Sequence, residues 1–302
     1  MNAHQKEQRA LALETELLAF HQNTLPLRGV VPPENMLAFI WQLIDSIQRV
    51  TYVQIVRVRP VSATRADPRS PSFDPIRAAI AAGQTEEAFW LVFLATHCGR
   101  NLRTEWRLAA ELYGASEAAP WTWARVLNDP QAYADWVEDH HETFTGKFGN
   151  HRKYESLRPG PTGTGAVVRS YVDWITGYGS HAAMVAQAQT NGNVRHAFRV
   201  LYEQMRAVLR FGRTGRFDYL TMLSKLGLAN IEADSTYMNE ATGPKRGARL
   251  LFDGQIDSNT GARVLEARVA ALERQLGVGM QVMEDAMCNW QKSPNSYQPF
   301  RG

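Results

Sequence analysis

Apolar residues recur at helical spacing along most of the chain and predict a mainly α protein. Residues 5–21 combine Ala, Leu and Glu with apolar side chains every three or four positions, and Pro33 precedes a second apolar helix over 36–50. By the same spacing and by flanking Gly or Pro, further helices are expected near 75, 85–98, 101–113, 131–142, 165–175, 180–190, 194–210, 218–226, 260–276 and 279–291. The chain shows no internal repeat of solenoid period.

Three segments depart from this pattern. Thr51–Val58 is β-branched and alternating, so it is either a short strand or the end of the preceding helix. Residues 60–75 contain four Pro and three Ser and predict a loop. Residues 143–165 contain five Gly and two Pro and predict a long loop, interrupted at most by a short helix around 151–157. Long loops in compact domains are often functional, which directs attention to this segment.

The domain organisation has two interpretations. We expect an N-terminal helical extension over 1–70 and a helical domain over 71–302. A single continuous domain is the alternative, because no segment has the composition of a flexible linker.

Composition excludes several classes of protein. With 302 residues, 44% hydrophobic and 21% charged, the chain is globular rather than disordered. The longest apolar run, 88–95, is too short to cross a bilayer, and the polar start resembles no signal peptide. Two Cys, Cys98 and Cys288, cannot build a disulfide framework, so we expect a cytoplasmic location.

Charge is nearly balanced overall, at +3, but it is unevenly distributed. Basic residues gather in 51–70, 147–169, 195–216 and 245–249, and acidic residues gather in other segments. Phosphate backbones favour such clusters because each neutralised phosphate releases a counterion. The alternative is a set of solvated helix faces, since Arg195, Arg199, Arg206 and Arg210 recur at helical intervals.

Metal and nucleotide-cofactor motifs are missing from the sequence. The eight His include no HxxxH pair, and the two Cys are isolated. The GPTGTG stretch at 160–165 follows no strand, so it does not predict a dinucleotide site. We therefore expect neither a metal nor a cofactor.

The densest polar cluster is FGNHRKYES, residues 148–156. It offers stacking surfaces, a base-edge amide, phosphate-binding cations and an acid/base carboxylate, in Phe148 and Tyr154, Asn150, Arg152 and Lys153, and Glu155 respectively. The alternative is an ordinary exposed helix start with a salt bridge.

A second cluster, DSTY over 234–237, contains a carboxylate and an aromatic ring. Asp234 is either the N-cap of a short helix or a carboxylate aimed at a sugar C1′. In the second role it would stabilise the oxocarbenium ion that forms as a base leaves, with Tyr237 available for stacking.

A third cluster, TGPKRGARLL over 242–251, predicts a tight turn leading into a helix that begins near Gly247. Amides at such a helix start bind phosphate, and Lys245, Arg246 and Arg249 add charge. The Gly/Arg turn at 211–217 adds Arg213 and Arg216 as further candidate DNA contacts. The pattern is that of a helix-hairpin-helix DNA grip; a plain interhelix turn is the alternative.

Four stretches carry a resemblance to a known family: FGNHRKYESL (148–157), SYVDWI (170–175), DSTYMNEATGPKRGARLLF (234–252) and VMEDAMCNWQKS (282–293). They resemble the alpha-glutamyl/putrescinyl thymine pyrophosphorylase family, clade 3, over roughly residues 85–293. The resemblance implies a helix-hairpin-helix DNA-glycosylase-like domain that acts on modified bases in phage-type DNA.

The resemblance also implies site residues. It points to Asn150 and Glu155 in the first cluster, to Asp234 in the second and to 243–249 as the hairpin-like element. Glycosylases of the wider superfamily carry a Gly-x-Gly hairpin and a catalytic Asp further on, a pattern that this chain lacks. Asp234 is therefore the first candidate for the catalytic carboxylate, followed by Glu155 and Asp173.

Three functions follow as hypotheses. The first is a monofunctional DNA glycosylase of anti-phage defence that flips out and excises a bulky base such as glucosylated hydroxymethylcytosine. The second is a transferase that modifies hydroxymethyluracil or thymine in DNA with an amine, and the third is a non-enzymatic DNA-binding module. The expected partner in each case is double-stranded DNA, with modified bases for the two enzymes, and no membrane.

Overall fold

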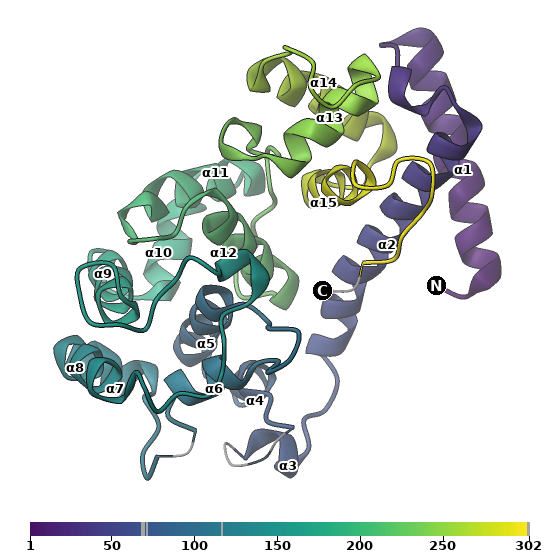
Figure 1. Ribbon diagram of the computed structural model, residues 1–302. Helices are drawn as coiled ribbons and strands as arrows, with labels where there is room; N and C mark the ends of the chain where they lie inside the picture. Colours follow the sequence, from purple (N-terminus) through teal and green to yellow (C-terminus); the bar gives the residue numbers. More distant parts are fainter. Residues whose placement is uncertain (68–69, 71, 116, 301–302) are drawn as a thin grey trace. The chain divides into compact units, whose positions relative to one another are not determined.

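The computed structural model describes residues 1–67, 70, 72–115 and 117–300, and the regular secondary structure of these residues is helical (Figure 1). They form fifteen α-helices joined by loops and short 3-10 turns, with no strand in the described residues. A single isolated bridge joins Asn101 and Glu105. The prediction of a mainly α fold is confirmed.

Backbone contacts divide the chain into two compact units. The terminal unit combines residues 1–53 with the described residues from 233 onward, and the central unit contains the described residues of 54–232. Helix α2 (Pro33–Arg57) crosses the first of these divisions in sequence. The predicted boundary at residue 70 coincides with neither division and stays a prediction.

The terminal unit is built around α13, which packs against α15, α14 and the 3-10 turn η1. Besides the first part of α2 it contains α1 (Ala3–Asn23), η1 (Arg28–Val30), η4 (Met238–Glu240), α13 (Gly243–Asp253), α14 (Ala262–Leu276) and α15 (Met280–Trp290). A Cβ on Gly247 would lie 2.2 Å from the Met287 carbonyl oxygen, so α13 and α15 approach closely only because this residue is glycine.

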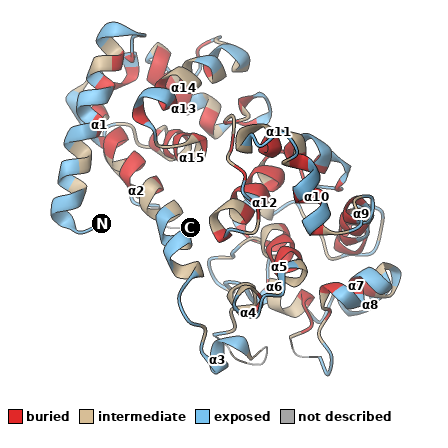
Figure 2. Ribbon diagram, turned by 180° about the vertical axis from the view of Figure 1, so that it is seen from behind, coloured by how far each residue is buried: buried red, intermediate tan, exposed pale blue. Residues whose placement is uncertain are grey.

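The central unit surrounds helix α5, which is buried on every side (Figure 2). After the end of α2 it contains α3 (Ala63–Ala66), α4 (Pro75–Ala81), α5 (Thr85–Cys98), α6 (Arg107–Leu112), α7 (Trp123–Asn128), α8 (Pro130–His140), η2 (Asn150–Arg152), α9 (Thr164–Thr176), α10 (His181–Ala188), α11 (Val194–Gln204), η3 (Met205–Ala207) and α12 (Arg213–Leu226). All seven residues of 88–94 are buried, and α4, α6, α7, α10 and α12 pack around this helix. A helix that is apolar all round is a core helix.

A buried polar chain crosses this core. The Glu86 carboxylate accepts hydrogen bonds from the His181 ring Nδ1 at 2.6 Å and from the His181 and Ala182 amides, so it caps α10 from another helix. His181 Nε2 lies 2.7 Å from the Tyr171 hydroxyl, which lies 2.8 Å from the Tyr219 hydroxyl. Burial alone would raise the pKa of Glu86, but these hydrogen bonds and the nearby His181 ring lower it to about 2.

Several local predictions are wrong, each where packing overrides local pattern. Residues 51–57 continue α2, so the strand interpretation fails. The helix expected over 101–113 begins only at Arg107, while α7 lies between the helices expected over 101–113 and 131–142, where none was predicted. Arg213 and Gly243 each begin a helix inside segments expected to be Gly-rich turns.

We predict that Glu86→Ala destabilises the protein, because it leaves a buried His181 ring and the start of α10 without their acceptor. The expected loss is about 1–3 kcal/mol in the free energy of unfolding at pH 7, measured by urea denaturation. The pKa of Glu86 is lower in the folded than in the unfolded chain, so its stabilisation exists above pH 4.5 and is lost as the pH falls toward 2. The difference in the free energy of unfolding between the variant and wild type should therefore decrease as the pH falls over that range.

Asp139→Ala, at an exposed position of α8, is the matched control and should leave the free energy of unfolding almost unchanged. Equal stability of Glu86→Ala and wild type at pH 7 would contradict the capping role.

Candidate functional site

The first predicted cluster lies on a segment held tightly against the C-terminal end of α5. The Gly149 amide donates to the Cys98 carbonyl at 2.8 Å, and the Asn101 side-chain amide donates to the Phe148 carbonyl at 2.9 Å. A Cβ on Gly149 would lie 2.8 Å from the Arg100 carbonyl oxygen, which leaves room for glycine alone. The segment 148–155 is therefore an ordered part of the central unit, as the long-loop prediction requires.

Glu155 is a largely buried carboxylate with a cationic partner. Its side chain is 10% exposed and lies 3.4 Å from the Arg210 Nε. Arg210 also donates to the Tyr154 carbonyl, so one guanidinium contacts both the Glu155 carboxylate and the Tyr154 backbone. Burial raises the pKa of Glu155, while Arg210 and Arg152 oppose that rise. A carboxylate with raised proton affinity suits general acid or base work.

Arg152 serves the framework of this site rather than its surface. Its Nε donates to the Thr96 carbonyl at 2.7 Å, and its terminal nitrogen binds Asp218 at 2.9 Å. Only 10% of its side chain is exposed. The predicted role in substrate binding is therefore opposed by two existing contacts, while its charge still acts on Glu155.

The predicted stacking residues differ in exposure. Phe148 is half-buried and packs edge-on against the His97 ring, with centroids 5.6 Å apart. Tyr154 is 75% exposed, and the Lys153 ammonium lies 5.2 Å from its ring centroid. Asn150 is exposed at the start of η2. Tyr154 and Asn150 thus remain accessible to a ligand, whereas Phe148 belongs mainly to the wall behind them.

The sequence patterns did not predict a role for two residues that lie next to the candidate site, His97 and Arg210. His97 is fully buried beside Phe93 and Phe211, and its Nε2 lies 3.0 Å from the Thr164 hydroxyl. Burial, with Arg152 and Arg210 nearby, lowers the pKa of His97 to about 3, so this ring is neutral. A single His at the end of an otherwise apolar helix was the signal available in the sequence.

The second cluster lies in the terminal unit. The Tyr237 hydroxyl donates to Asp234 at 2.6 Å, and Tyr237 holds a left-handed backbone with φ of 49°. Tyr237, not Asp234, is the N-cap residue of η4, so the N-cap interpretation of Asp234 is wrong. Asp234 and Tyr237 instead form a hydrogen-bonded pair of carboxylate and phenol.

The third cluster is the first two turns of α13 rather than a turn before it. The helix begins at Gly243 with Pro244 in its first turn, and the Thr242 side chain makes no capping bond. The predicted turn over 243–247 is therefore wrong, and the hairpin-like element expected over 243–249 is helical. Lys245, Arg246 and Arg249 nevertheless line one open cavity of about 600 Å³, together with residues 239–242, Ile256 and Asp257. Two carboxylates, Glu240 and Asp257, lie among these three cations, so the cavity has a small excess of positive charge, which is compatible with an anion.

Arg213 and Arg216 are buried, which speaks against their predicted contacts with DNA phosphates. Their side chains belong to residues only 7% and 3% exposed. The Arg213 guanidinium lies 4.8 Å from the Phe217 ring centroid and that of Arg216 lies 4.2 Å from Tyr202. The sequence alone does not show that each of these guanidinium groups packs over an aromatic ring inside the central unit.

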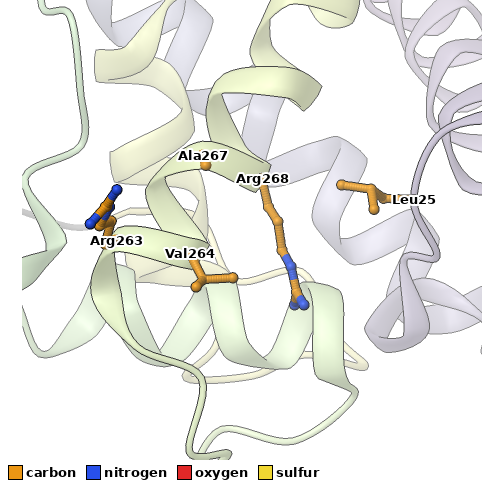
Figure 3. Close-up of a pocket in the computed structure, with 5 residues that line it drawn as sticks. All are labelled: Leu25, Arg263, Val264, Ala267 and Arg268. Atoms are coloured by element: carbon orange, nitrogen blue, oxygen red, sulfur yellow. The ribbon is translucent and has the colours of Figure 1, made fainter.

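A second cavity of about 600 Å³ in the terminal unit has a mainly apolar lining (Figure 3). Leu25, Val264 and Ala267 line it, with Arg263 and Arg268 beside them. Arg268 binds Asp253 at 2.9 Å, and none of the described residues that line the cavity is a carboxylate.

The predicted residues thus fall into two sets. Asn150, Tyr154 and Glu155 belong to the central unit, and Asp234 belongs to the terminal unit with the α13 cations. Asp173, the third candidate carboxylate, is exposed on α9. The prediction that Asn150, Glu155 and Asp234 form one site stays a prediction.

Among the residues that the structure describes, no group of three or more His, Cys, Asp or Glu side chains is placed to hold a metal ion. None of the described helices combines the length and the hydropathy that a bilayer span requires.

A family model for alpha-glutamyl/putrescinyl thymine pyrophosphorylase clade 3 matches residues 34–302. The chain belongs to this family. The match begins earlier than the expected range of 85–293 and includes most of α2, so the family fold draws on both units. Comparisons with curated proteins and with solved structures find no match. This family consists of enzymes related to DNA modification.

For this member of the clade 3 family we predict that Arg210→Ala raises the pKa of Glu155. Arg210 lowers that pKa through its charge and hydrogen bond, so its removal leaves burial less opposed. The measurement is a carboxyl ¹³C NMR titration, with the Glu155 resonance assigned by its loss in Glu155→Gln.

Arg206→Ala, which breaks an exposed pair with Glu203, is the control and should not move the Glu155 midpoint. A midpoint that is the same in Arg210→Ala and in wild type would contradict the electrostatic coupling.

Proposed function

We propose that the protein is a monofunctional DNA glycosylase that excises a bulky modified base, of the glucosylated hydroxymethylcytosine type, in defence against phage. The observation that supports this most is Glu155, a carboxylate buried beside Arg210 and next in sequence to the exposed Tyr154. An N-glycosidic bond breaks with positive charge building on the sugar, and a carboxylate in a poorly solvated place stabilises that charge.

The proposed reaction is a hydrolysis. A nucleotide leaves the base stack, its base lies on the Tyr154 ring, and the Asn150 amide pairs with its edge. The C1′–N bond breaks, water adds its oxygen to C1′, and Glu155 accepts the proton of that water. The base leaves with a proton from solvent, and an abasic site remains. This mechanism uses no Lys as a covalent nucleophile.

Asp234 remains the alternative carboxylate. It accepts a hydrogen bond from the Tyr237 hydroxyl, whereas Glu155 lies beside the Arg210 guanidinium and burial raises its pKa. Of the two, Glu155 better matches a group that must exchange a proton near neutral pH.

The cations of α13 supply a surface for the DNA backbone. Lys245 and Arg246 lie in the first turn of the helix, where backbone amides and the helix dipole also favour an anion. This surface supports DNA as the substrate class and carries no information on base identity.

Amine transfer is the second candidate, and the family description favours it because that description names a thymine pyrophosphorylase. In that reaction an amine replaces the pyrophosphate of an activated hydroxymethyl group on thymine, and the glycosidic bond stays intact. The two candidates therefore differ in which bond breaks.

We predict that the purified protein releases free modified base from phage DNA that contains glucosylated hydroxymethylcytosine, and that Glu155→Gln slows release by a factor of about 10²–10⁴. Mass spectrometry of free bases and of digested nucleosides measures both products at once. Alkali-labile sites report the abasic product.

Glu203→Gln, an exposed acid on α11, is the control and should excise at the wild-type rate. A mass gain on a thymine-derived nucleoside without free base would support transfer instead. Full activity of Glu155→Gln with loss of activity in Asp234→Asn would assign the chemistry to Asp234.

We predict that Lys245→Ala weakens binding to an unmodified duplex and lowers the slope of log K against log salt by about 0.9, the value for one lost phosphate contact. Fluorescence anisotropy at several salt concentrations measures both. Lys292→Ala, which removes a cation that contacts Asn289, is the control and should leave the slope unchanged. If the slope is unchanged in Lys245→Ala, this residue does not contact a DNA phosphate, and the proposed role of the α13 surface is contradicted.

A further inference from the structure

The loop between α5 and α6 presents an apolar tip on a rigid base. Asn101 and Glu105 exchange two backbone hydrogen bonds, at 3.0 and 2.9 Å. The Asn101 side-chain oxygen accepts from the Arg103 and Thr104 amides at 2.9 and 3.1 Å. Within this closed turn Leu102 is 67% exposed. These hydrogen bonds close the turn and leave the Leu102 side chain exposed to solvent.

Positive charge surrounds this tip. Residues 99–107 and the adjoining Lys147 contain four cations, all exposed: Arg100, Arg103, Arg107 and Lys147. Their single acid, Glu105, binds Arg100 at 3.0 Å. Single exposed leucines are common on protein surfaces, but a rigid apolar tip among cations matches a polyanion with an apolar interior. Duplex DNA has this combination of a charged backbone and stacked bases.

The loop is hydrogen-bonded to the segment that precedes the candidate site. The Lys147 amide donates to the Thr104 hydroxyl at 3.1 Å, and the Asn101 side chain donates to the Phe148 carbonyl. At its other end, a Cβ on Gly99 would lie 3.1 Å from the Arg152 Cγ. These contacts hold the tip at a fixed place relative to the segment that contains Tyr154 and Glu155.

We propose that this loop is a DNA wedge, in which Leu102 enters the base stack where a nucleotide has been extruded, while Arg103 and Arg107 bind flanking phosphates. The inference rests on the proposed function, because a wedge is useful to a protein that flips nucleotides. Extrusion leaves a gap between base pairs, and an apolar side chain in that gap replaces lost stacking and slows the return of the nucleotide.

The test uses the full-length protein and two duplexes. One carries a tetrahydrofuran abasic-site analogue opposite 2-aminopurine, and the other has an intact base pair at that position. The first is called the gapped duplex, because one base is missing from its stack. Wild type should bind it more tightly than the intact duplex and change the 2-aminopurine fluorescence. Leu102→Ala should lose about tenfold in affinity for the gapped duplex, the size expected for a lost stacking contact, and less than about twofold for the intact one.

Two further variants separate the parts of the proposal. Arg103→Ala should weaken binding to both duplexes equally, because a phosphate contact is independent of the gap. Leu127→Ala removes another exposed leucine of the central unit, on α7, and should bind both duplexes as wild type does. Circular dichroism establishes that each variant is folded.

Equal affinities of Leu102→Ala and wild type for the gapped duplex would overturn the wedge, as would a wild type with no preference for the gap. Base excision from modified phage DNA is measured in parallel. Gap preference that depends on Leu102, without excision by wild type, would support the wedge and contradict the glycosylase. Excision by wild type, with the same gap binding in Leu102→Ala, would support the glycosylase and overturn the wedge.

Discussion

The burial of helix α5 on every side is the constraint on which the central unit depends. Its apolar middle needs neighbours all round, so polar groups can be placed only at its two ends. At the first end Glu86 caps α10. At the other end the Thr96 and Cys98 carbonyls accept from Arg152 and Gly149, and these two bonds fix the 148–155 segment. The candidate site thus lies at the polar C-terminal end of a buried helix.

The same burial determines the electrostatics of that site. His97 is buried at the end of α5, where no solvent would stabilise the positive charge of an imidazolium. The ring therefore remains neutral beside Arg152 and Arg210. The guanidinium of Arg152, by contrast, donates hydrogen bonds to Asp218 and to the Thr96 carbonyl. Two cations therefore face the buried Glu155, and their charge opposes the effect of its burial.

Sequence patterns predicted what depends on local spacing and missed what depends on distant contacts. Most helices follow from apolar periodicity, and the first cluster was found because its polar residues are adjacent in the chain. Arg210 lies 55 positions from Glu155, so no local pattern joins them. Gly247 looked like part of a turn, but it is the helical residue that lets α13 approach α15. Arg213 and Arg216 looked like surface cations because their aromatic partners were not visible in the spacing.

Two opposing effects on Glu155 suit this carboxylate to both halves of the proposed hydrolysis. Burial favours the protonated form, which lets the group take a proton from attacking water. Arg210 favours the ionised form, which keeps negative charge available while a sugar cation develops. A carboxylate in water would lack the first property, and one buried alone would lack the second. The proposed chemistry therefore depends on the pairing of Glu155 with Arg210 rather than on either residue alone.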